Sequence, residues 1–339
     1  MSLRGGVFAD EAISSGGRAW CGRDRFAGAR DDVALQPLQK NWGVMKDSTK
    51  ALFKLNGWRV DRAIHGYVYF TWIDYYIKTL MAIARRYVRL LPRGRFIFDF
   101  FFNRYHCKVL TEEQAVKLLR LERDIEVAPE CSSRIIPYPH ANRIVLNQPG
   151  SIVVMDCACR IERGVTDLED LGVCIAVGEP VASFWLEHGA ERLHARRLSA
   201  TEAIEIMRRA RAKGSIPTAW FKDAAGDGFF AICNCGPGVC DALEAAQIAG
   251  RLQVDNPPGI ALASGYSARV DRSLCIGCGT CVKSCPFKAI ALDGEDKAVV
   301  IFDLCMGCGL CVDGCKQDAF SLVRDERKGT PLDIGELSS

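Results

Sequence analysis

The chain has 339 residues, of which 49% are hydrophobic and 25% charged, a composition typical of globular proteins with two or three domains. Its net charge of +3 is too small to indicate nucleic-acid binding by itself. Seventeen cysteines without a preceding secretory signal favour a reducing, cytoplasmic compartment, because an oxidising one would convert them to disulfides.

The first two segments of the chain differ in character. In residues 1–40, glycine and polar residues interrupt every apolar run, so we predict a disordered leader. Residues 41–110 contain thirteen lysines and arginines against four aspartates, an excess of nine positive charges. Within them, residues 67–91 place apolar and charged side chains on separate helical faces. This pattern predicts an amphipathic helix that carries too many charges to be transmembrane.

Two interpretations of this basic, aromatic segment (residues 41–110) stay open. Its apolar face can pack on the rest of the protein while its charges are solvated. Alternatively, the helix can lie peripherally on an anionic membrane surface or in the groove of a partner. We do not expect nucleic acid as a partner, because the aromatic residues are bunched on apolar faces and are not spaced among the basic ones.

Residues 111–265 alternate predicted helices and strands. Thr111 with Gln114, and Ser199 with Glu202, have the form of capping boxes, which predict helices through about residue 121 and to near residue 214. Three apolar runs are predicted to be buried strands: residues 151–155, 173–177 and 229–232. The alternation favours a small α/β domain, within a chain that is α+β or α/β overall.

Each of two predicted strands is followed by a Cys-x-Cys pair. We expect the two thiols of a pair to face opposite sides of an extended strand, so that a turn is needed before both can bind one metal. The pairs then suggest a third metal centre, iron–sulfur or zinc; the alternative is buried, unligated cysteines. Arg160 is expected to donate to a sulfide or thiolate there, or else to be a surface cation. The candidate ligands are Cys157, Cys159, Cys233 and Cys235, with Cys174 and Cys240 as substitutes.

Residues 266–325 contain one cysteine spacing twice, followed by a tail at residues 326–339. The runs are Cys275-x2-Cys278-x2-Cys281-x3-Cys285 and Cys305-x2-Cys308-x2-Cys311-x3-Cys315. They align at a constant offset of 30 residues, and glycines recur between the cysteines. This duplication predicts a small module with approximate two-fold symmetry, and its spacing is that of proteins with two [4Fe–4S] clusters. A pair of four-cysteine zinc sites is the weaker alternative, because zinc motifs seldom repeat this spacing.

Residues 269–325 resemble a bacterial-type two-[4Fe–4S] (dicluster) ferredoxin. In that family the fourth cysteine of each run ligates the other cluster. The resemblance therefore implies two ligand sets: Cys275, Cys278, Cys281 and Cys315 for one cluster, and Cys305, Cys308, Cys311 and Cys285 for the other.

The second run departs from the family pattern in one place. The first run ends in Cys285-Pro286, whereas the second ends in Cys315-Lys316. Lysine brings a free N–H group and a positive charge near Cys315, and both stabilise the more negative, reduced state of a cluster. We therefore expect two clusters of unequal reduction potential.

The resemblance implies an electron-transfer iron–sulfur protein that serves a redox partner. One alternative is a reductase or enzyme subunit whose middle domain holds a third, substrate-facing centre, and another is a redox sensor. The Cys-x-Cys region is similar, more loosely, to ferredoxin-like proteins of anaerobes. A Gly-x-Gly-x-x-Ala match at residues 226–231 leads into a predicted strand, so it does not indicate a dinucleotide site.

Overall fold

The computed structural model describes residues 45–90, 104–138, 140–241, 243–244 and 261–334. The predicted leader, residues 1–40, lies outside these ranges, as does the end of the predicted helix at residue 91. In the described part of the chain, no helix is long and apolar enough to cross a membrane.

The largest element of the described structure is an eight-stranded sheet with the order β2-β3-β4-β7-β6-β1-β8, in which β5 also pairs with β3. Neighbouring strands run antiparallel except β1 and β8. The α/β class is typical of parallel strands joined by helices, so this sheet corresponds to the α+β class. Its strands are β1 (Tyr105–Val109), β2 (Ile125–Glu126), β3 (Val145–Asp156), β4 (Gly172–Glu179), β5 (Arg196–Leu198), β6 (Ile216–Lys222), β7 (Gly228–Cys235) and β8 (Ala261–Leu262).

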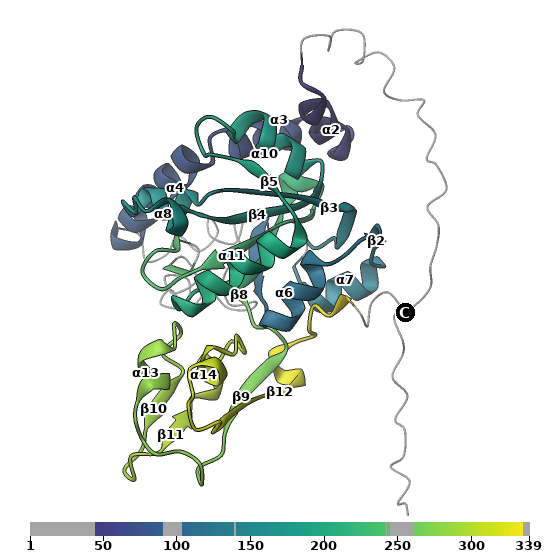
Figure 1. Cartoon of the computed structure of the whole chain (residues 1–339). Helices are drawn as coiled ribbons and strands as arrows, with labels where there is room; N and C mark the ends of the chain where they lie inside the picture. Colours follow the sequence, from purple (N-terminus) through teal and green to yellow (C-terminus); the bar gives the residue numbers. More distant parts are fainter. Residues whose placement is uncertain (1–44, 91–103, 139, 242, 245–260, 335–339) are drawn as a thin grey trace, which may run out of the picture.

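Helices cover both faces of this sheet (Figure 1). One face carries α2 (Asp47–Leu55), α3 (Val60–Thr71), α4 (Ile73–Leu90) and α10 (Val181–Gly189), and the other carries α6 (Glu112–Leu119) and α11 (Ala200–Ala212). Shorter elements connect them: α7 (Pro129–Ile135), α8 (Ala158–Glu162), α9 (Leu168–Leu171) and η2 (Asp223–Ala225). The apolar core between these layers is continuous. We call this part of the molecule the sheet domain.

Local sequence signals explain where its main elements begin. Both capping boxes are present, with the side chains of Thr111 and Ser199 accepting hydrogen bonds from the backbone N–H groups of Gln114 and Glu202. The three predicted strands form and are longer than predicted. The Gly-x-Gly motif opens strand β7 at Gly228, as expected for a match without a dinucleotide site.

The described part of the basic segment contains three helices, α2, α3 and α4. The single helix predicted over residues 67–91 is divided between α3 and α4, because the chain breaks at Trp72. The apolar face of α4 packs on the sheet through Ile73, Ile77 and Met81, which are buried. Strand β1 also belongs to this segment and pairs with β6. Residues 105–109 are thus part of the same sheet as the chain that follows.

The C-terminal residues form a small module with an internal repeat. The ladder of β9 (Tyr266–Val270) and β12 (Phe320–Arg324) and the ladder of β10 (Ile290–Leu292) and β11 (Ala298–Val300) are both antiparallel. Short helices α13 (Thr280–Ser284) and α14 (Leu310–Asp313) follow equivalent glycines, and 3₁₀ turns occur at η3 (Phe302–Leu304) and η4 (Glu326–Lys328). The module lies on the α11 side of the sheet domain (Figure 1).

Candidate metal centres

One cavity of the module, of about 350 Å³, is lined by three cysteines of the first run and the last cysteine of the second. They are Cys275, Cys278, Cys281 and Cys315. The backbone N–H of Ala298 lies 3.4 Å from the sulfur of Cys275. Gly277 has a φ of +72°, and a Cβ there would lie 2.2 Å from the carbonyl oxygen of Asp296, so only glycine fits. We call this the outer cavity.

A second cavity, of about 340 Å³, has the reciprocal composition. It is lined by Cys305, Cys308, Cys311 and Cys285. The N–H groups of Ala268 and Ala289 lie 3.5 Å and 3.3 Å from the sulfurs of Cys305 and Cys285. We call this the inner cavity. Each cavity thus brings together three cysteines of one run and the fourth of the other, which is the grouping that the resemblance implies.

The two cavities differ in their exposure to solvent. Cys278 is exposed, whereas the equivalent Cys308 is buried. Hydrogen bonds from the side chain and backbone of Thr280 lower the pKa of Cys278. Burial raises the pKa of Cys308 to about 11. Cys308 and its neighbour Leu310 belong to the apolar core of the sheet domain, so the inner cavity is the one that faces it.

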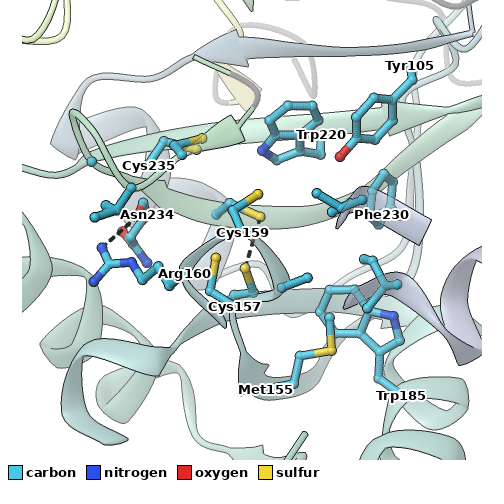
Figure 2. Close-up of a pocket in the computed structure, with 18 of the residues that line it drawn as sticks. Tyr105, Met155, Cys157, Cys159, Arg160, Trp185, Trp220, Phe230, Asn234 and Cys235 are labelled. Atoms are coloured by element: carbon cyan, nitrogen blue, oxygen red, sulfur yellow. Dashed lines mark hydrogen bonds between the residues drawn. The ribbon is translucent and has the colours of Figure 1, made fainter. Parts of the chain in front are cut away.

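The sheet domain contains a third cavity, of about 530 Å³, and six cysteines line it (Figure 2). They are Cys157, Cys159, Cys174, Cys233, Cys235 and Cys240. The rest of the wall is largely aromatic and apolar, with Tyr69, Tyr105, Trp185, Trp220 and Phe230 among the lining residues. The four favoured candidate ligands and both substitutes therefore meet in one place. We call it the six-thiol cavity.

Strand pairing brings these thiols together. Cys174 on β4 is the cross-strand neighbour of Cys233 on β7, and their sulfurs are 3.5 Å apart. Cys233 and Cys235 both lie within β7. The expectation that the chain must turn at this pair was wrong, because residues i and i+2 of a strand lie on the same face. Cys157 is the N-cap residue of α8, whose first turn contains Cys159.

Contacts between thiols connect all six cysteines, and the contact between Cys233 and Cys174 is a hydrogen bond. Bonds from Cys159 and Cys174 hold the pKa of Cys157 well below its ordinary value. The same contacts raise the pKa values of Cys159 and Cys174. At Cys240, the bond with Cys159 lowers the pKa, but the bond with Cys235 and burial outweigh it. The contacts run in the order Cys233, Cys174, Cys157, Cys159, Cys240 and Cys235.

Arg160 supports the frame of this cavity. It is 7% exposed, so the prediction of a surface cation was wrong. Its guanidinium donates to the carbonyl oxygen of Asn234 at 3.2 Å, to the hydroxyl of Ser215 at 3.0 Å and to the carbonyl oxygen of Asp170 at 2.7 Å. Asn234 separates Cys233 from Cys235 (Figure 2), so Arg160 fixes the backbone that presents both thiols.

The donor set fits a polynuclear metal group better than a single ion. Thiolates are the form of cysteine that binds metals, and several cannot ionise together in an apolar cavity unless positive charge is added. Among the described residues, no three ligand side chains converge on a point that could hold one metal ion. This holds for the cavities of the module as well as for the six-thiol cavity.

Several arginines of the basic segment pair with acidic residues that follow the segment in the chain. Arg85 on α4 pairs with Glu162, Asp241 and Glu244. Arg62 pairs with Asp227. These contacts favour the packing interpretation, although Trp58 and Ile64 remain exposed. Contact with an anionic membrane surface stays a prediction.

From the sequence, Cys174 and Cys240 were predicted only as substitute ligands, and the aromatic wall of the cavity was not predicted. Cys174 is isolated in the sequence, and only the pairing of β4 with β7 places it beside Cys233. Tyr69 and Tyr105 come from α3 and β1, within the basic, aromatic segment that was predicted to be separate from the α/β domain. Nothing in their local sequence indicates a shared cavity.

Comparison with known families matches residues 268–322 to the 4Fe-4S dicluster domain. A comparison with curated proteins finds no match. The family match covers the two cysteine runs and ends before the tail, and it confirms the suspected resemblance. Together with the two reciprocal cavities, it identifies the C-terminal module as a 4Fe–4S dicluster domain, which implies [4Fe–4S] clusters and iron–sulfur electron transfer.

Proposed function

We propose that the protein carries electrons through two [4Fe–4S] clusters, one in each cavity of the dicluster domain, to or from a partner oxidoreductase. The observation that carries this proposal is the reciprocal composition of the two cavities. In the proposed ligand sets, Cys275, Cys278, Cys281 and Cys315 hold the outer cluster, and Cys305, Cys308, Cys311 and Cys285 hold the inner cluster. When bound, such clusters supply one-electron transfer.

The residues of the chain prepare both cavities for this chemistry. Backbone N–H groups of Ala268, Ala289 and Ala298 point at cysteine sulfurs. These donors favour the more negative, reduced state of a cluster. The alanines leave little side-chain bulk around the cavities, and Phe320 packs in the same small core and lines the outer cavity.

Iron and acid-labile sulfide, counted per chain after anaerobic purification, test the proposal. We expect at least about eight of each, and the reduced protein should give an EPR spectrum of two interacting clusters. Zinc in place of iron, or iron without acid-labile sulfide, would contradict the proposal.

We further propose that the six-thiol cavity holds a third, polynuclear iron–sulfur centre, which would make the chain a subunit of a reductase or a related enzyme. Six connected thiols in one cavity favour this second function. They exceed the four ligands of a cubane. The aromatic wall next to them leaves an apolar space in which a substrate could approach the centre.

The double variant Cys157→Ser/Cys233→Ser tests the third centre in the full chain. Iron should fall from about twelve to about eight atoms per chain, while the EPR signals of the dicluster domain stay as in the wild type. Cys107→Ala is the matched control, because Cys107 is fully buried in β1 and does not line the cavity. Equal iron in the double variant and the wild type would refute a third centre.

A further inference from the structure

The two halves of the dicluster domain meet different surroundings, although their sequences repeat. Ile276, Cys278 and Thr280 of the first run are exposed. At the equivalent positions of the second run, Cys308 and Leu310 are buried. The inner half is buried by the sheet domain, because Leu310 and Cys308 belong to its core and Ser264 donates to the carbonyl oxygen of Gly307 at 2.8 Å.

A buried cation lies at this contact. Arg211, near the end of α11, is 6% exposed. Its guanidinium donates to the carbonyl oxygen of Cys308 at 2.9 Å and to the carboxylate of Asp313 at 2.6 Å. Glu112 lies 3.6 Å away. Both carboxylates are within ion-pair distance of Nε, and among the described residues Nη1 of Arg211 has no hydrogen-bond partner.

At the equivalent place of the outer cavity, the described residues include no buried cation; the half-buried Lys297 instead donates to the carbonyl oxygen of Cys275. Gly309 lies against Arg211, since a Cβ on this glycine would be 3.0 Å from Nη2. The equivalent Gly279 has only Leu292 within 4 Å, at 3.9 Å.

Hydrogen bonds also connect the C-terminal end of α11 to the six-thiol cavity. The N–H of Ser215 donates to the carbonyl oxygen of Ala210 at 3.0 Å, which closes the end of the helix. The hydroxyl of Ser215 then accepts a hydrogen bond from Arg160, which also holds Asn234. The residues from Arg211 to Ser215 therefore lie between the inner cavity and the six-thiol cavity.

We propose that Arg211 is a positioning residue that sets the order of electron transfer. It ties the inner site to the sheet domain and raises the reduction potential of the inner cluster, while the outer site is the one that a redox partner meets. This inference rests on the proposed function, because it needs both clusters. A buried positive charge stabilises the more negative, reduced state, and solvent screens it little. The inner site then receives electrons from the outer site and faces the six-thiol cavity.

An EPR-monitored redox titration of the anaerobically purified full chain tests this proposal. Arg211→Gln should lower the potential of the inner cluster and leave that of the outer cluster unchanged. Arg209→Gln is the matched control on the same helix, because Arg209 is exposed and pairs with Glu169; it should titrate like the wild type. The outer signal is identified by its broadening with a soluble paramagnetic metal complex, which reaches the exposed site first.

Asp313→Asn provides a second variant in case Arg211→Gln does not load iron. Asp313 is 46% exposed, so the fold should tolerate the change. Removing this carboxylate should raise the potential of the inner cluster, the opposite direction from Arg211→Gln.

If the reduction potentials of both clusters shift together, or if neither variant shifts the potential of the inner cluster, the proposed role of Arg211 is wrong. It would leave the proposed function standing if the clusters are present. Wild-type protein without iron and acid-labile sulfide would overturn the proposed function itself, so the two failures are distinguishable.

Discussion

The sheet domain and the dicluster domain hold their thiols in opposite ways. The six-thiol cavity is set in a core that contains large apolar side chains from every layer, such as Trp185, Phe184 and Phe221. The separate core of the dicluster domain has ten buried residues, of which four are cysteines and four are alanines. One domain can fold around its thiols without a metal. The other has little to pack except the thiols, and its folding should depend on metal binding.

Removal of iron should produce the largest effect, and it tests most directly whether the two domains differ in their dependence on metal. We expect the dicluster domain to lose its structure while the sheet domain keeps its fold, because only the former depends on bound metal for its core. Hydrogen exchange measured by mass spectrometry on the full chain, before and after iron removal, checks this. If residues 266–324 stay protected from hydrogen exchange in the iron-free protein, the dicluster domain does not depend on metal for its fold.

Removal of a crossed ligand should affect one cluster only. Cys285→Ser belongs to the first run, but Cys285 lines the inner cavity, so the inner cluster should be lost or change its EPR signal. Cys315→Ser is the reciprocal control and should affect the outer cluster. If each substitution instead alters the cluster of its own run, the proposed ligand sets are wrong.

A glycine substitution should weaken the dicluster domain in proportion to the local crowding. A Cβ on Gly307 would lie 2.2 Å from the carbonyl oxygen of Tyr266, at a φ of +66°. Gly307→Ala should therefore cost about 2–4 kcal/mol, the sum of left-handed strain and overpacking. Gly279→Ala shares the positive φ but has open space around its Cβ, so it should cost only about 1 kcal/mol. Thermal release of iron compares the two variants, and equal release temperatures would contradict the crowding argument.

The stability of the dicluster domain should depend on iron. That of the sheet domain should instead depend on pH, through Lys108. Burial lowers the pKa of Lys108 to about 7, far below its value in an unfolded chain, about 10.4. Between these values the unfolded state binds the extra proton, so the contribution of Lys108 to stability rises with pH. The stability of Lys108→Met relative to the wild type should thus decrease by about 1.4 kcal/mol per pH unit over this range.

Urea unfolding followed by tryptophan fluorescence measures this difference. All six tryptophans precede residue 221, so the signal excludes the dicluster domain. A pH-independent difference between Lys108→Met and the wild type would contradict this prediction, because it would show that the amine stays protonated in the folded protein, with a pKa close to that of the unfolded chain.

The smallest expected effect is that of Lys316→Pro on the outer cluster. Lysine 316 is exposed, so water and salt screen its charge. We still expect a lower reduction potential, because a cation and an N–H near Cys315 are both lost. The decrease should be smaller than that of the inner cluster in Arg211→Gln. A redox titration with an unchanged or raised potential would remove Lys316 as a cause of unequal clusters.

The same difference between the domains explains what could be predicted from the sequence. Cysteines of the dicluster domain lie within ten residues of one another in each run, so their spacing alone indicated a cluster. The capping boxes at Thr111 and Ser199 were also local signals, and both helices were predicted. The six-thiol cavity depends on contacts such as that between Cys174 and Cys233, which are 59 residues apart. Such contacts follow from the order and direction of the strands, which the alternation of helices and strands did not reveal.

The reciprocal composition of the outer and inner cavities has a consequence for the origin of the domain. A chain with a single run would place three cysteines in its own cavity and offer the fourth to a neighbour. Two copies related by a two-fold axis would complete each other, as in an isologous dimer. Joining the copies at an offset of 30 residues makes this exchange intramolecular, so that the high effective concentration of the linked half replaces dimerisation. Once linked, the halves were free to diverge, and only one of them came to lie against Arg211.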